Sequence, residues 1–107
     1  MKEVTTAPVS VFFNIGKSKI ASRKDLQNVK AMTETNKNGK FVVTGYADSK
    51  TGSAAFNQKL SQKRAETVAD ELVKMGVSRD NIEIVAAGGV DNLTPISYNR
   101  RATVEIK

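Results

Sequence analysis

Residues 44–68 read TGYADSKTGSAAFNQKLSQKRAETV, and this stretch decides the fold that we expect. It follows an apolar run that is typical of a β-strand, and it passes through a glycine-containing loop into a helical pattern. The pattern predicts a helix that begins near Ser53 and continues to about Met75, where Gly76 ends it. The stretch therefore predicts a strand, a loop and a long helix in this order.

One charged side chain of this helix lies on the side that should face the core. At 100° per residue, Val68 lies about 80° and Arg64 about 40° from Leu60. Two polar residues share this side: Asn57 and Ser61. A buried guanidinium needs an anion nearby, so we expect Asp48, a bound ligand or both beside Arg64. The alternative is that Arg64 extends past the edge of the core into solvent.

Size and composition exclude several classes of protein. The chain has 107 residues, which is one small domain, and no apolar run is long enough to predict a membrane span. It has no cysteine and no histidine, which excludes thiol catalysis, histidine-based triads and the usual zinc sites, and no cofactor is expected. The net charge of +6 favours polyanions such as nucleic acid, acidic lipid head groups or an anionic wall polymer, or it serves solubility alone.

The order of apolar patterns predicts an α+β fold with the elements β-α-β-α-β-β. Strands are expected at residues 9–13, 40–46, 82–86 and 101–107, and helices at residues 23–36 and 53–75. We expect a two-layer sandwich, in which both helices cover one face of a mixed sheet. Residues 1–7 are expected to form a flexible tail, and residues 8–107 to form the domain.

Local signals refine these elements. Ser22 is expected to cap the first helix with Asp25 at its third position, and residues 88–98 are expected to form an irregular loop. Alternation directs three side chains of the third strand toward the helices: Ile82, Ile84 and Ala86. In the last strand it directs Ala102, Val104 and Ile106 inward, and Thr103 and Glu105 outward.

Four motifs resemble those of the OmpA-like peptidoglycan-binding domains, and together they cover the chain from about residue 9. The helix motif N-x-x-L-S-x-x-R-A-x-x-V is matched by Asn57, Leu60, Ser61, Arg64, Ala65 and Val68. The others are an opening aromatic strand at residues 11–14, a turn at residues 45–48 and a closing N-R-R strand from residue 99. Each motif alone is weak, but four in this order are fairly specific.

The resemblance implies a domain that is not an enzyme and that binds the diaminopimelate of the peptidoglycan stem peptide. It implies that Asp48 and Arg64 are the main anchors of this ligand. Diaminopimelate has a carboxylate, which a guanidinium can hold with two hydrogen bonds. It also has an ammonium group, from which an aspartate can accept a hydrogen bond. Before ligand binds, Asp48 and Arg64 are expected to neutralise each other.

Further ligand contacts are implied at five positions: Asn57, Ser61, Asn99, Arg100 and Tyr46. For Asn57 and Ser61, a local cap or a satisfied polar contact is an equal alternative. Arg100 shares the parity of the inward residues of the last strand, whereas Arg101 has the opposite parity and is expected to face solvent. Tyr46 replaces the histidine of the family turn, and Asn14 and Gly16 also depart from the family pattern.

The resemblance implies that the domain anchors an outer-membrane or envelope protein to the cell wall, at the periplasmic face of a Gram-negative outer membrane. Its partner is then the stem peptide, with membrane attachment only through a segment upstream, and the domain is a monomer or a weak homodimer. A basic nucleic-acid-binding module is the alternative, but the exposed aromatic motif of RNA-binding sheets is missing. A hydrolase would need a second acid beside Asp48, and none is evident.

Overall fold

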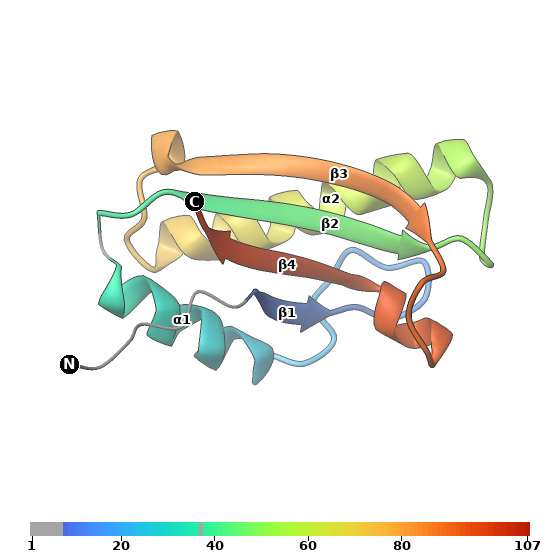
Figure 1. The fold of residues 1–107 in the computed structure, drawn as a ribbon, viewed down its shortest axis with the longest axis horizontal. Helices are drawn as coiled ribbons and strands as arrows, with labels where there is room; N and C mark the ends of the chain where they lie inside the picture. Colours follow the sequence, from blue (N-terminus) through green and yellow to red (C-terminus); the bar gives the residue numbers. More distant parts are fainter. Residues whose placement is uncertain (1–7, 37) are drawn as a thin grey trace.

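In the part of the chain that the structure describes, four strands and two helices follow one another in the order β-α-β-α-β-β (Figure 1). The computed structural model describes residues 8–36 and 38–107, so the expected tail at residues 1–7 lies outside the described residues. The strands are β1 (Val9–Phe12), β2 (Phe41–Asp48), β3 (Ile82–Val90) and β4 (Arg101–Ile106). The helices are α1 (Asp25–Thr35) and α2 (Ala54–Lys74), with short 3₁₀ turns η1 (Arg79–Asn81) and η2 (Ile96–Asn99).

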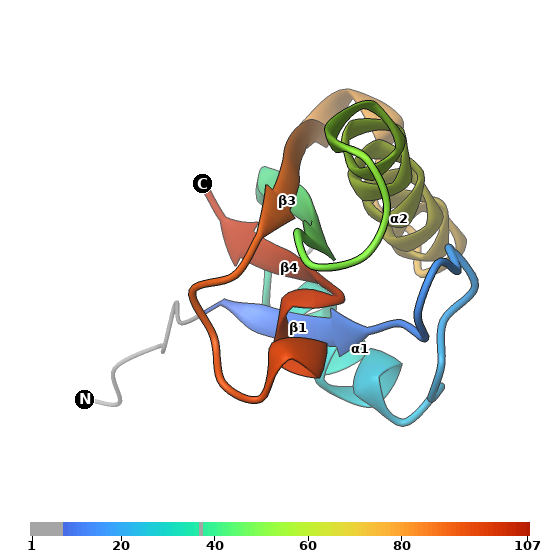
Figure 2. The same cartoon turned by 90° about the vertical axis from the view of Figure 1, so that its right-hand side faces the viewer.

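The strands form one mixed sheet in the order β1-β4-β2-β3. β2 and β3 are parallel, whereas β4 is antiparallel to both β1 and β2. Both helices cover the same face of this sheet (Figure 2). The predicted two-layer α+β fold is therefore confirmed, and the structure adds the strand order, which the sequence pattern left open.

α2 begins and ends where the sequence predicts. The Ser53 hydroxyl accepts a hydrogen bond from the backbone N–H of Phe56 at 3.1 Å, which satisfies one free donor of the first turn. After Met75 the chain leaves the helix at Gly76, whose φ of 102° favours glycine. α2 packs so closely on β2 that a β-carbon at Gly45 would collide with the backbone carbonyl of Ser61.

The expected cap of α1 is wrong. The helix begins at Asp25, and Ser22 makes no side-chain cap. The Asp25 carboxylate instead accepts a hydrogen bond from the backbone N–H of Phe12 at 3.1 Å. The acid that a capping box would use therefore joins the start of α1 to the end of β1.

The two later strands differ from the prediction in length and burial. β3 continues through Gly88, which was expected to begin a loop, because a register shift and a φ of 74° at this glycine let the strand continue. Ile84 does not turn fully inward: it is 37% exposed, like its neighbour Val85, because β3 is at the edge of the sheet. Thr103 is buried although it has the outward parity, since β4 lies between two other strands.

The core lies between the sheet and both helices. Its buried members are Val11, Phe13, Leu26, Val29, Met32, Phe41, Val43, Ala65, Val68, Leu72, Val77, Ala102 and Val104. The inward alternation predicted for β4 is confirmed for Ala102 and Val104, which have no exposed surface. Among the described residues, neither helix has the length and apolar character needed to cross a membrane.

Candidate functional site

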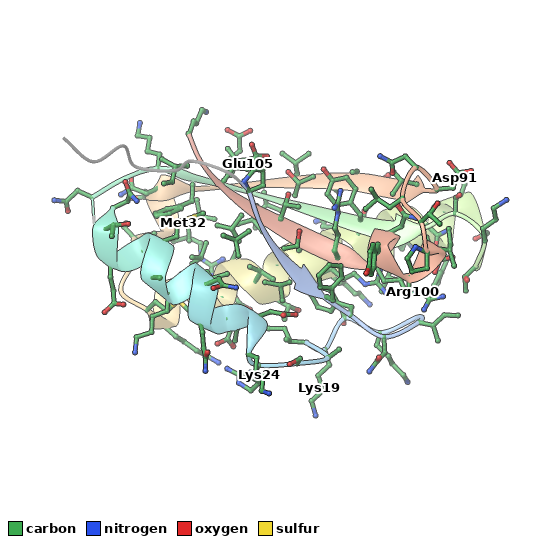
Figure 3. All side chains as sticks on the ribbon, turned by 60° about the horizontal axis from the view of Figure 1, so that its bottom comes forward. Lys19, Lys24, Met32, Asp91, Arg100 and Glu105 are labelled. Carbon is green, nitrogen blue, oxygen red and sulfur yellow. The ribbon has the colours of Figure 1, made fainter. Side chains whose placement is uncertain are left out.

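The predicted site residues gather at one end of the sheet, where β2 ends and β4 begins. Asp48 is the last residue of β2, and Arg100 directly precedes β4. The first turns of α2 start at the same end and contribute Asn57. Figure 3 shows Arg100 at this end of the molecule. The fold therefore brings the end of β2 and the start of α2 together with Arg100, which follows Asp48 by 52 residues in the chain.

An ion pair between Asp48 and Arg100 lies at the centre of this end. Nε of Arg100 donates to Oδ2 of Asp48 at 2.6 Å, and the two side chains are 20% and 3% exposed respectively. The second oxygen of Asp48, Oδ1, is buried and has no hydrogen-bond partner among residues 8–36 and 38–107. In this part of the chain, neither Nη1 nor Nη2 of Arg100 makes a hydrogen bond. The pair therefore keeps both an acceptor and donors unused.

The environment of Asp48 keeps its carboxyl group ionised. Burial by itself raises the pKa of Asp48, but the hydrogen bond from Arg100, the nearby polar side chain of Thr51 and the positive charges of Arg100 and Arg64 outweigh it. The pKa of Asp48 is therefore lower than its ordinary value. At neutral pH the site contains a carboxylate between two cations.

Arg64 is fully buried and is held by backbone carbonyl groups. Its Nη1 donates to the carbonyl of Tyr46 at 2.8 Å. Its Nε and Nη2 donate to the carbonyls of Lys17 at 2.9 Å and Asn14 at 3.0 Å. The guanidinium carbon also lies 5.3 Å from the ring centre of Phe13. Arg64 thus joins α2 to β2 and to the loop that follows β1.

This placement corrects two expectations for Arg64. Its exposed fraction is 0%, so it does not extend past the core into solvent. Within the described residues its hydrogen bonds go to carbonyl groups, and Asp48 forms its ion pair with Arg100 instead. Burial lowers the pKa of Arg64 to about 10, against the opposing charge of Asp48, so the guanidinium is still protonated at neutral pH.

Three predicted contact residues are buried and bonded to backbone. The amide of Asn57 donates to the backbone carbonyl of Asp48 at 3.3 Å. The Ser61 hydroxyl donates to the carbonyl of Gln58 at 2.8 Å and accepts from the N–H of Gly88 at 2.9 Å. Asn99 bonds to both backbone groups of Leu93, which closes the loop before η2. These side chains fix the walls of the site.

Tyr46 was also predicted to contact the ligand. Its side chain is half-buried and packs against Arg101. The guanidinium carbon of Arg101 is 5.0 Å from the centre of the Tyr46 ring. The expectation that Arg101 faces solvent is wrong in part, because its Nε is buried without a hydrogen-bond partner among the described residues. The ring and the guanidinium form a stacked pair of the cation–π type.

The sequence did not reveal the groups that hold Arg64. The carbonyls of Asn14 and Lys17 are 50 and 47 residues away in the chain, and carbonyl groups are the same in every residue type. The aromatic run at residues 11–14 was the only available signal, because Phe13 supplies the ring beside Arg64. Chemically, the site can bind a ligand that carries both charges, with Oδ1 of Asp48 as acceptor and Arg100 as donor.

Comparisons with known proteins identify relatives of this chain. The outer membrane protein 40 of Porphyromonas gingivalis is 42% identical over 85 residues, which are 78% of this chain and 22% of that protein. The peptidoglycan-binding protein ArfA of Mycobacterium tuberculosis is 36% identical over 108 residues, which are 96% of this chain and 32% of ArfA. This chain therefore spans a third or less of these two relatives.

A solved structure shows the same fold. The crystal structure of the peptidoglycan-associated lipoprotein from Burkholderia pseudomallei matches 92% of this chain and 89% of that chain, with a TM-score of 0.76 and 24% identity. The sequence model of the OmpA family matches residues 12–104, which include Asp48, Arg64 and Arg100. On this match, the chain belongs to the OmpA family.

Proposed function

We propose that this domain binds peptidoglycan without a covalent bond, through the diaminopimelate of the stem peptide, and that it anchors an envelope protein to the cell wall from the periplasmic side. Family membership supports binding of this kind, since one relative is named as a peptidoglycan-binding protein and one similar structure as a peptidoglycan-associated lipoprotein. The observation that carries the proposal is the half-used ion pair of Asp48 and Arg100.

The two residues have complementary roles toward a zwitterion. The unpartnered Oδ1 of Asp48 accepts from the ammonium group of diaminopimelate. The Nη groups of Arg100 donate to its carboxylate, and the partial exposure of Arg100 gives the ligand access. Each charge-assisted hydrogen bond contributes about 1.5–3 kcal/mol in such a setting. A ligand with only one of the two charges leaves half of the site unpaired.

Arg64 supports this site from behind. Its positive charge favours the ionised form of Asp48, and its bond to the Tyr46 carbonyl fixes the end of β2. Three of the five N–H groups of its guanidinium are engaged with carbonyls, so two remain for a ligand that reaches it. We assign the first contact with the ligand carboxylate to Arg100 and a supporting role to Arg64. Asn57, Ser61 and Asn99 hold the backbone around the site, and Tyr46 contributes its carbonyl to Arg64.

The test is a calorimetric titration with a diaminopimelate-containing muropeptide and with its lysine-type counterpart, which lacks the side-chain carboxylate. The wild-type domain should prefer the first ligand. Asp48→Asn and Arg100→Gln should each weaken its binding about tenfold or more, because each removes one ionic hydrogen bond. Glu83→Gln, in an exposed ion pair at the other end of the sheet, is the matched control and should bind as the wild type does.

Two results would count against the proposal. Equal affinity for both muropeptides would remove the role of the carboxylate, and full binding by Arg100→Gln would remove the assigned contact. Arg64→Lys separates the two arginines, because it keeps the charge and loses the planar fork. If a folded Arg64→Lys variant loses more affinity than Arg100→Gln, then Arg64 is the direct anchor. Binding to single-stranded DNA that falls steeply with salt would instead favour the nucleic-acid alternative.

A further inference from the structure

The positive charge of this protein is concentrated in two segments without acidic residues. Residues 14–24 contain four lysines and arginines and no aspartate or glutamate. Residues 49–64 also contain four, again without an acid. The first segment lies between β1 and α1, and the second lies between the end of β2 and the middle of α2. The two segments are far apart in sequence, so their contact depends on the fold.

Three side chains of α2 hold the loop after β1 along the helix. Arg64 binds the carbonyls of Asn14 and Lys17, as described above. One turn later, the hydroxyl of Thr67 donates to the carbonyl of Ser18 at 2.9 Å. One turn further, Glu71 accepts from Arg23 at 2.9 Å. The loop therefore runs beside α2 and joins the two basic segments (Figure 2).

The lysines at this junction point into solvent. Lys17, Lys19, Lys59 and Lys63 are all exposed, and Figure 3 shows Lys19 protruding from the molecule. On α2, Lys59 and Lys63 lie within about 80° of Thr67, which contacts the loop. The ion pair of Asp70 with Arg79 at 2.7 Å neutralises one acid of this helix side, and Glu66 accepts a hydrogen bond from Gln62.

Two exposed apolar side chains belong to the same two basic segments: Ile15 and Phe56. Ile15 is 51% exposed in a tight turn, which is closed by a hydrogen bond from Lys17 N–H to Asn14 C=O at 3.0 Å. Gly16, with a φ of 65°, completes the turn, and apart from Gly16 and its two chain neighbours no atom of residues 8–36 and 38–107 lies within 4 Å of the position of its missing β-carbon. Phe56 is 46% exposed and shares a helix side with Lys63. Arg64 binds the carbonyls on both sides of this turn, so the turn keeps Ile15 exposed to solvent.

We propose that these residues form a docking surface for an anionic phospholipid bilayer. We call it the basic turn surface and define it by Ile15, Lys17, Lys19, Phe56, Lys59 and Lys63. Its lysines meet the negative surface potential of the lipid head groups, and Ile15 and Phe56 enter the boundary between head groups and acyl chains. The domain would then lie on a membrane surface through one flank, without crossing it.

The apolar tips favour a bilayer over a dissolved polyanion. Lysines alone attract both, and in both cases the attraction falls as salt rises. A dissolved polyphosphate or nucleic acid offers no apolar region, so Ile15 gains nothing from such a partner. In a bilayer, burial of the Ile15 side chain is favourable. Because Arg64 already fixes the turn, the turn loses little conformational freedom when it binds.

The test is co-sedimentation of the domain with vesicles of phosphatidylcholine, with or without phosphatidylglycerol, at low and at physiological salt. The wild type should bind only the vesicles that contain phosphatidylglycerol. The triple variant Lys17→Gln, Lys19→Gln, Lys63→Gln should lower the partition coefficient on the order of 100-fold, at about fivefold for each lysine near an anionic surface. Ile15→Ser should lower it about tenfold, because it removes apolar burial and leaves the charge unchanged.

A second triple variant is the matched control: Lys40→Gln, Lys74→Gln, Lys107→Gln. It removes the same charge at the far end of the sheet and should bind the vesicles nearly as the wild type does. The proposal is overturned if the wild type ignores phosphatidylglycerol vesicles, or if both triple variants lose binding equally. It is also overturned if soluble polyphosphate binds more tightly than the vesicles and Ile15→Ser does not change vesicle binding. No peptidoglycan is present, so the result is independent of the proposed wall binding.

Discussion

The two ends of the sheet each contain an ion pair, and the two pairs differ in burial rather than in length. Arg100 and Asp48 are 2.6 Å apart with side chains 20% and 3% exposed. Lys107 and Glu83 are 2.8 Å apart with side chains 59% and 51% exposed. Water and salt surround the second pair, so it contributes little. Of the two pairs, only the first has a buried atom without a hydrogen-bond partner among the described residues, and a ligand can use this atom.

Arg64 should produce the largest difference between the ends. Arg64→Met removes the donors of three backbone carbonyls and should lower the free energy of unfolding by about 3 kcal/mol or more. Lys107→Met, at the exposed end, should change it by less than about 0.5 kcal/mol. Urea denaturation of both variants measures this, and similar midpoints would show that the buried guanidinium does not hold the loops together.

Removing one carboxylate from each pair should give the next largest difference. Asp48→Asn loses the charged acceptor of Arg100 and should lower the free energy of unfolding by about 2 kcal/mol. Glu83→Gln should cost less than about 0.5 kcal/mol. The same denaturation experiment compares them. If Asp48→Asn is as stable as the wild type, the pair at the site gives no net stability.

Acid should remove the advantage of the buried pair. The pKa of Asp48 is below its unfolded value, so its stabilisation is present above about pH 4 and is lost as the pH falls through that range toward the folded pKa. The stability difference between wild type and Asp48→Asn should therefore shrink below about pH 4. Thermal unfolding of both proteins at a series of pH values tests this, and a constant difference would contradict the assigned pKa direction.

Salt should produce the smallest effect, and only at the exposed end. Coupling between Lys107 and Glu83, on the order of 0.3 kcal/mol, should vanish in high salt, because exposed charges are screened. Coupling between Arg100 and Asp48 should persist. A double-mutant cycle for each pair at two salt concentrations measures both, and equal salt dependence would mean that water reaches Asp48.

The sequence predicted the fold well where an element is set by residues at its own ends. Ser53 and Gly76 bound α2 as expected, because a hydroxyl cap and a positive φ are local properties. Gly88 was misleading, since a glycine that looked like the start of a loop completes an irregularity inside β3. Asp25 was misleading for a different reason: its partner, the N–H of Phe12, lies on another element.

The site was predicted in location but only in part in its contacts. Parity in the last strand predicted that Arg100 lies on the inward side, and the strand order, which the sequence left open, brings it beside Asp48 in the structure. The sequence could not predict that Asp48 pairs with Arg100 rather than Arg64, because this choice depends on the three backbone carbonyls that hold the guanidinium of Arg64. Every residue type has the same backbone carbonyl, so the sequence does not show which carbonyls will bind a given guanidinium, and only the folded structure does.

The direction of the strands has a mechanical consequence. β1 enters and β4 leaves the sheet at the end opposite Asp48, since Val9 pairs with Val104 and Ile106 pairs with Phe41. A pull between a ligand held at Asp48 and either of these strand ends is directed along the strands. The hydrogen bonds between neighbouring strands lie across that direction, so they share the load and do not open one after another. Under the proposed function, this orientation lets the sheet resist tension along its strands.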